Sequence, residues 1–150
     1  MPIIQLTTQI RAPIEWCFDL ARDIDLHVTS MKGSGERAVA GVTQGMISLG
    51  EEVTWEAIHF GIRQRLTSRI TVFDRPRHFQ DRMVKGAFKR FCHDHYFEHT
   101  AGVTTMIDIF DYVSPWGPFG RLADLLVLNR YLRRLLMERA RVVRAAAESR

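Results

Sequence analysis

The clearest alternation of hydrophobic and polar positions runs from Phe88 to Val113 and predicts a β-hairpin with a tight turn at Ala101-Gly102. Folding the segment about this turn sets four residue pairs on one face. These pairs are Phe97 with Met106, His95 with Asp108, His93 with Phe110, and Phe91 with Tyr112. Such a mixture of aromatic, imidazole and carboxylate groups is typical either of a core that holds a polar network or of the wall of a ligand cavity.

The segments before the hairpin predict one strand and two short helices. Residues 3–11 alternate and read as a half-buried strand. Pro13 is suited to the first position of a helix that ends near Arg22. Asp23 or Asp25 can cap a second short helix that continues to Ser30.

The middle of the chain predicts further antiparallel strands. A short strand is expected around residues 36–39, and a longer one over 46–60 pairs with 62–73 across a turn at Phe60-Gly61. This register sets Glu56 opposite Arg65 and Glu52 opposite Arg69 on a solvated face. The opposite, interior face then carries Trp55, Ser68 and other less polar residues.

A strand over 78–84 completes the prediction, and its register is open to two interpretations. A plain two-residue turn at Lys85-Gly86 would set Gln80 and Arg82 beside Phe91, whereas one bulged residue would set Phe79, Asp81 and Met83 there. The second arrangement buries the more apolar side chains and is preferred. In that case Asp81 joins the histidines on the interior face.

The C-terminal part of the chain predicts a long helix over residues 119–147. Leucines including Leu126, Leu132 and Leu136 form an apolar stripe, and Arg130, Arg134, Arg141 and Arg144 lie on the opposite side. The order of elements predicts an α+β fold, with a curved antiparallel sheet of about seven strands wrapped around the C-terminal helix. Because one helix cannot fill the concavity of such a sheet, a cavity is expected between them.

The composition limits the classes of protein to which the chain can belong. The 150 residues, 46% of them hydrophobic, are enough for a single domain spanning 1–150 with a sizeable core. We expect a cytoplasmic protein, because the sequence contains neither a membrane-spanning apolar run nor a signal-peptide pattern, and its two cysteines, Cys17 and Cys92, have no metal-site spacing.

The charge is concentrated near the C-terminus. Residues 117–150 carry eight arginines against three acids, within a total net charge of +4. An arginine-rich helical face can contact anionic lipid or a partner protein, although most such faces are simply solvated. Without interleaved aromatics, the pattern does not support nucleic-acid binding.

The sequence also resembles the START-like (SRPBCC) superfamily over nearly its whole length. The resemblance rests on Thr8, Ile10, Ala12-Pro13, Glu15 and Phe18-Asp19-Leu20, on the segment from Gly50 to Gly61, and on Gly117 and Gly120 before the long helix. The stretch His93-Asp94-His95 with Phe97 is similar to a bacterial subgroup. The resemblance implies the helix-grip fold and a function among lipid, quinone or polyketide ligand carriers and polyketide cyclases or dehydrases. Because these functions share few residues, it does not choose among them.

The candidate chemistry centres on His93, His95 and Asp108. An imidazole oriented by a carboxylate can act as a general acid or base, so these three are the candidate catalytic residues. The same groups could instead anchor a ligand's polar atoms or satisfy one another in a core. Two strand histidines with Asp81 or Asp108 could also hold zinc or iron, but we expect no metal or other cofactor, since such ligand sets usually recruit further histidines and His59 falls at a distant turn. We expect His27, His78 and His99 at the surface.

The leading hypothesis is a protein that binds one hydrophobic small molecule, such as a lipid, quinone or aromatic polyketide, between sheet and helix. The alternatives are a polyketide cyclase or dehydrase that uses His95 with Asp108, and a regulatory module that acts through the basic helix. The predicted ligand-binding residues combine polar anchors with an apolar wall. They are Trp55, Ser68, Asp81, Phe91, His93, His95, Phe97, Met106, Asp108, Phe110, Tyr112, Leu126 and Leu132.

Overall fold

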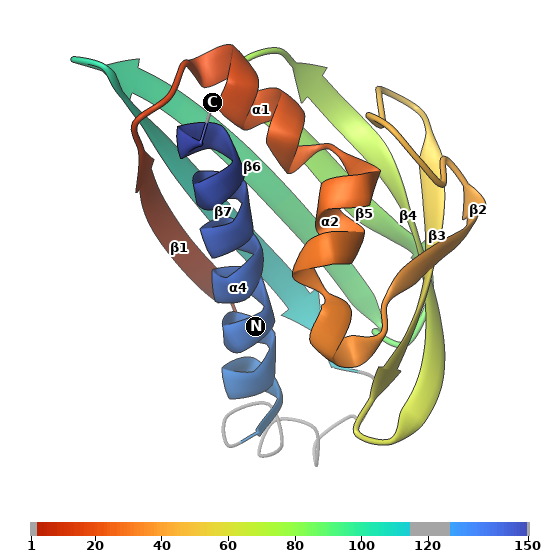
Figure 1. Ribbon diagram of the computed structural model, residues 1–150. Coiled ribbons are helices and arrows are strands. Elements are labelled where there is room, and N and C mark those ends of the chain that lie inside the picture. Colours follow the sequence, from red (N-terminus) through yellow and green to blue (C-terminus); the bar gives the residue numbers. More distant parts are fainter. Residues whose placement is uncertain (1–2, 115–126, 150) are drawn as a thin grey trace.

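The computed structural model describes residues 3–114 and 127–149, which form a curved antiparallel sheet with helices on one side (Figure 1). The strands are β1 (Ile3–Ile10), β2 (Arg37–Gly41), β3 (Glu52–His59), β4 (Ile62–Asp74), β5 (His78–Lys85), β6 (Arg90–Thr100) and β7 (Val103–Val113). The helices are α1 (Ile14–Ala21), α2 (Ile24–Ser30), a 3-10 turn at Lys32–Ser34, and α4 (Asn129–Glu148). The seven strands lie in the order β1-β7-β6-β5-β4-β3-β2.

The predicted hairpin forms β6 and β7 with the predicted register. Phe97 pairs with Met106, His95 with Asp108, and His93 with Phe110. Ala101 and Gly102 both have positive φ, 53° and 81°, as a two-residue turn that matches the strand twist requires. Phe60 and Gly61 repeat this turn between β3 and β4, with φ values of 53° and 76°.

The predicted register of the other strands is also found, with one correction. Glu56 faces Arg65 across β3 and β4. On β5, Asp81 faces His93, so the arrangement that places Asp81 inside is confirmed. The strand predicted from Met46, however, begins only at Glu52. Ile47 lies outside the sheet, where its side chain is buried and its backbone N–H donates a hydrogen bond to the carbonyl oxygen of Arg22, at 3.2 Å.

The helices cover the concave face unevenly (Figure 1). Asp23 caps α2 as predicted, accepting hydrogen bonds from the backbone N–H groups of Asp25 and Leu26. Of the long terminal helix predicted over 119–147, the part before residue 127 lies outside the described residues. In the described part, Ala140, Val143 and Ala147 join Phe18 in the core beneath the last turns of α4. None of the helices in residues 3–114 and 127–149 is long and apolar enough to cross a membrane.

Candidate functional site

A cavity of about 270 Å³ lies on the concave face of the sheet beside α4. Its walls come from the α1–α2 junction, from the inner faces of β3 to β7, and from one side of α4. Most of the lining side chains are apolar, and both hydrophobic core clusters contribute to the wall. Eight of the predicted ligand-binding residues line it: Trp55, Ser68, Asp81, Phe91, His93, His95, Phe110 and Leu132.

Four other predicted wall residues do not line the cavity. Phe97 and Met106 are in the core with Phe18, whose ring centre lies 5.4 Å from that of Phe97. Tyr112 is fully buried against Phe88, and Asp108 lies behind the histidines. They share the inward face of the hairpin as predicted, but only part of that face, including Phe91, His93, His95 and Phe110, borders the cavity. Leu126 lies outside the described residues.

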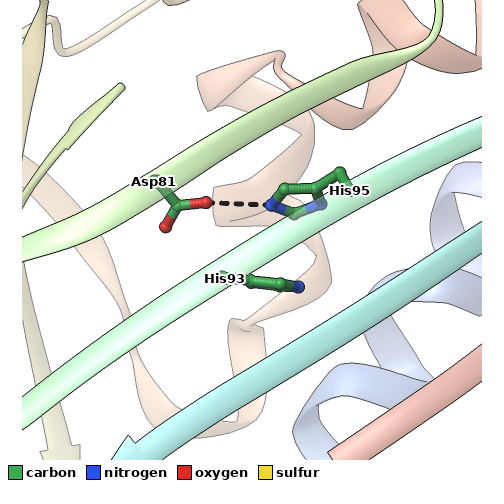
Figure 2. Close-up of side chains that lie close together, drawn as sticks. All are labelled: Asp81, His93 and His95. Carbon is green, nitrogen blue, oxygen red and sulfur yellow. Dashed lines mark hydrogen bonds and ion pairs between the residues drawn. The ribbon is translucent and has the colours of Figure 1, made fainter. Parts of the chain in front are cut away.

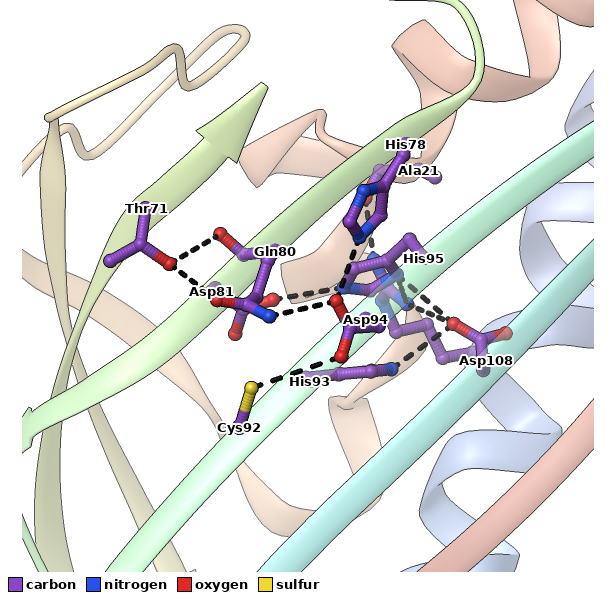
Figure 3. A network of polar contacts seen from close by, with 11 residues as sticks. Ala21, Thr71, His78, Gln80, Asp81, Cys92, His93, Asp94, His95 and Asp108 are labelled. Atoms are coloured by element: carbon purple, nitrogen blue, oxygen red, sulfur yellow. Dashed lines mark hydrogen bonds and ion pairs between the residues drawn. The ribbon is translucent and has the colours of Figure 1, made fainter. Parts of the chain in front are cut away.

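The polar part of the site is a cluster of five side chains, Asp81, His93, His95, Asp108 and Arg139, which we name the polar cluster. Figure 2 shows Asp81, His93 and His95, and Figure 3 shows them together with Asp108. His95 lies at its centre, with Nε2 2.9 Å from an Asp81 oxygen and Nδ1 3.0 Å from Asp108. His93 Nε2 lies 3.1 Å from the same Asp108 oxygen. Two strand neighbours on one face thus share a carboxylate on the adjacent strand.

These contacts set the charges of the cluster. Burial alone would raise the pKa of Asp108, but the hydrogen bonds from His93 and His95 bring it well below its ordinary value. Burial also disfavours the imidazolium of His95, yet its bonds to Asp108 and Asp81 raise the pKa of His95 overall. For His93, burial and the adjacent charge of His95 prevail and lower the pKa. These shifts favour an ionised Asp108, a cationic His95 and a neutral His93.

Arg139 completes the cluster and was not among the predicted site residues. It is only 6% exposed, with Nη1 3.6 Å from Asp108, and its Nη2 donates a short hydrogen bond to the carbonyl oxygen of Ala21 at the end of α1. The sequence carried a signal for it, because Arg139 lies between Leu136 and Val143 on the apolar stripe of the helix. An arginine at such a position requires a buried acceptor, and Asp108 supplies one.

A second group of polar residues lines another part of the cavity. The Tyr131 hydroxyl lies 2.6 Å from Nδ1 of His59, and burial lowers the pKa of His59, which favours a neutral ring that accepts this hydrogen bond. His27 was predicted at the surface, but it lines the cavity, stacks on Trp55 at 4.2 Å between ring centres, and bonds Glu36 at 2.6 Å. The prediction missed both histidines because they lie outside the β6–β7 hairpin, His27 on α2 and His59 at the end of β3, so the alternation along the hairpin carries no information on them.

Asp81, His93 and His95 could also hold a metal ion. Each offers one ligand atom, and the three atoms lie within 4.8 Å of one another (Figure 2). Two imidazoles and a carboxylate suit zinc or iron(II). A cation would have to displace the proton between His95 and Asp81, so metal binding and this ion pair exclude each other.

We expect the histidines to impose a pH dependence on stability. Because the folded state raises the pKa of His95, its contribution is complete below the ordinary pKa near 6.5 and is lost as the pH rises through the folded value. The lowered pKa of His93 acts in the opposite sense below pH 6.5. Urea unfolding between about pH 6.5 and 8.5 should therefore show stability falling with pH in the wild type. The fall should disappear in His95→Gln, and a fall that persists there would contradict the assignment.

The architecture is the helix-grip fold of START-like proteins: a curved seven-stranded antiparallel sheet, two short helices after the first strand, and a long C-terminal helix. No family model and no curated protein matches the sequence. Solved structures show the likeness in fold. The TTHA0849 protein of Thermus thermophilus matches with a TM-score of 0.75 at 21% identity, over 97% of this chain and 99% of its own.

Two further solved structures match over nearly the whole chain. The Zhui aromatase/cyclase of a Streptomyces species matches with a TM-score of 0.76 at 14% identity, over 98% of this chain and 93% of its own. A START superfamily protein of Mycobacterium smegmatis matches with a TM-score of 0.70 at 12% identity, over 98% and 97%. At these identities the comparisons establish the fold and leave the activity to be argued from the site.

Proposed function

We propose that the protein binds one hydrophobic small molecule, such as a lipid, a quinone or an aromatic polyketide, in the cavity between the sheet and α4. The observation that carries the proposal is a mostly apolar cavity of about 270 Å³ whose wall includes Asp81, His93, His95 and Arg139 of the polar cluster. This combination is typical of small-molecule sites, in which apolar walls supply affinity and a few polar groups orient the ligand. The volume lies near the lower end of the range for such sites, about 300 Å³, and fits a compact ligand.

The proposal is tested by filling the cavity. Ser68 is buried on the inner face of β4, so Ser68→Leu should occupy part of the ligand volume. If the leucine excludes about 60 Å² of ligand surface, then at roughly 25 cal/mol per Å² the affinity falls about tenfold. Titration with the neutral fluorescent probe phenylnaphthylamine measures the effect. Mass spectrometry of extracts from freshly purified protein should in addition identify a bound natural ligand.

The matched control is Thr71→Leu, on the exposed face of the same strand. It adds the same side chain outside the cavity and should leave probe affinity unchanged. Equal affinities for the two variants, with both folded, would contradict binding in this cavity.

Acid-base catalysis of a cyclase or dehydrase type is a second candidate, and the geometry favours His93 as the base in place of His95. Both nitrogens of His95 face carboxylates. His93 uses only Nε2 toward Asp108, lines the cavity and has a lowered pKa, so its neutral ring can accept a proton at Nδ1. If the protein is such an enzyme, His93→Gln should lower turnover far more than it lowers ligand affinity.

A regulatory contact through the basic helix remains a prediction with less support. Arg141 and Arg144 pair with Glu138 and Glu148 on the same helix, at 2.7 and 3.4 Å, which partly neutralises that face. Arg139 is buried and cannot take part.

A further inference from the structure

The donors of the polar cluster are already committed within the protein. Both nitrogens of His95 lie within 3.0 Å of carboxylate oxygens, and Nδ1 also lies 3.5 Å from Nη1 of Arg139, so neither nitrogen is free to donate to a ligand. Arg139 directs Nη1 toward Asp108 and Nη2 to the Ala21 carbonyl oxygen. His93 likewise donates its Nε2 proton to Asp108. A ligand therefore meets few unused cationic donors here.

The polar atoms of the cluster that have no partner among the described residues are hydrogen-bond acceptors. Asp81 lines the cavity and uses one carboxylate oxygen toward His95, and its other oxygen has no hydrogen-bond partner in residues 3–114 and 127–149. Nδ1 of His93 also has no partner within the described chain, and since Nε2 faces the Asp108 carboxylate and carries the ring proton, Nδ1 of the neutral ring has its lone pair free. Two free acceptors thus belong to side chains of the cavity wall.

Ser68 supplies the remaining polar group. Its side chain lines the cavity from β4, it is only 4% exposed, and its hydroxyl has no hydrogen-bond partner among the described residues. A buried hydroxyl without a partner costs free energy unless a ligand or water satisfies it. Unlike Asp81 and His93, it can donate as well as accept.

We propose that the ligand carries a hydroxyl group, phenolic or alcoholic, and donates its one proton to the free oxygen of Asp81 or to Nδ1 of His93. The inference rests on the proposed function and adds the chemical class of the ligand's polar end. Ser68 can donate a hydrogen bond to the same ligand oxygen. A keto or ether oxygen would leave both acceptors unsatisfied, and a carboxylate would add a third anion beside Asp81 and Asp108, whose charges His95 and Arg139 already balance.

The test uses three ligands that share one apolar skeleton: 2-naphthol, 2-methoxynaphthalene and 2-naphthoate. Calorimetric titration of EDTA-treated wild-type protein at neutral pH should give naphthol an affinity about tenfold or more above that of the methyl ether, as expected for a hydrogen bond to a charged acceptor. Naphthoate should bind least tightly of the three. Equal affinities for naphthol and ether, or tightest binding of naphthoate, would overturn the inference while leaving the proposed function intact. Failure of all three to bind would count against the proposed function itself.

Substitutions of two aspartates test whether Asp81 causes the preference for naphthol over the methyl ether. Asp81→Asn removes the anionic acceptor, so the preference for naphthol over the ether should fall severalfold. The matched control is Asp94→Asn, because Asp94 bonds His78 and Gln80 and neither Asp94 nor those two partners line the cavity. It should retain the wild-type preference, and an equal loss in both variants would overturn the assignment to Asp81. If Asp81→Asn does not fold, the wild-type ligand series decides by itself.

Discussion

Replacement of Asp108 by asparagine is expected to lower the free energy of unfolding by about 3 to 5 kcal/mol. Asp108 is 2% exposed and lies 3.1 Å from His93, 3.0 Å from His95 and 3.6 Å from Arg139. The amide keeps the shape of the side chain but removes the charge that balances two buried cations. Urea denaturation near pH 7, followed by circular dichroism, measures the loss.

The control is Asp111→Asn, on the same strand with its side chain on the opposite face. Asp111 pairs with Arg90 at 3.2 Å, and both side chains are about one third exposed or more. Exposed pairs contribute about 0 to 1 kcal/mol, so this variant should stay within that range. Similar losses at the two positions would show that Asp108 does not hold the cluster together.

The strand register around this cluster could be predicted because it depends on local information. A side-chain period of two residues and a glycine at the second turn position fix the pairing of the β6–β7 hairpin, and with it the placement of His95 beside Asp108. The inward position of Asp81 could be predicted from one further argument, namely that β5 should bury Phe79 and Met83, which lie on the same strand face as Asp81.

The limits of the cavity could not be predicted in the same way, because they depend on where helices cross the sheet. Phe97 and Phe91 both point inward from β6, yet Phe97 packs against Phe18 of α1 while Phe91 borders the cavity. Alternation along a strand distinguishes the inner face from the outer face. It carries no information on which part of the inner face a helix covers.

The contribution of α4 to the polar cluster was missed for a related reason. The hydrophobic periodicity of the helix predicts an apolar stripe opposite an arginine face, and Arg139 belongs to the stripe. Counting positions three and four residues apart along the helix shows that an arginine lies among the apolar residues of the stripe. Recognising Asp108 as its partner still requires the fold, since the two residues come together only when α4 packs across the sheet.

Replacement of Arg139 by methionine is therefore expected to destabilise the protein by about 3 kcal/mol, because Asp108 loses a cation and the Ala21 carbonyl oxygen loses its donor. The informative measurement is a double-mutant cycle with Asp108→Asn by urea denaturation. If the two charges serve chiefly to balance each other, the double variant should be less destabilised than the two single losses together, by about 1 kcal/mol or more. Strict additivity would mean that each side chain acts through separate contacts. In that case the charge balance would not explain why an arginine lies on the apolar side of α4, and the short bond to the end of α1 would become the better reason for it.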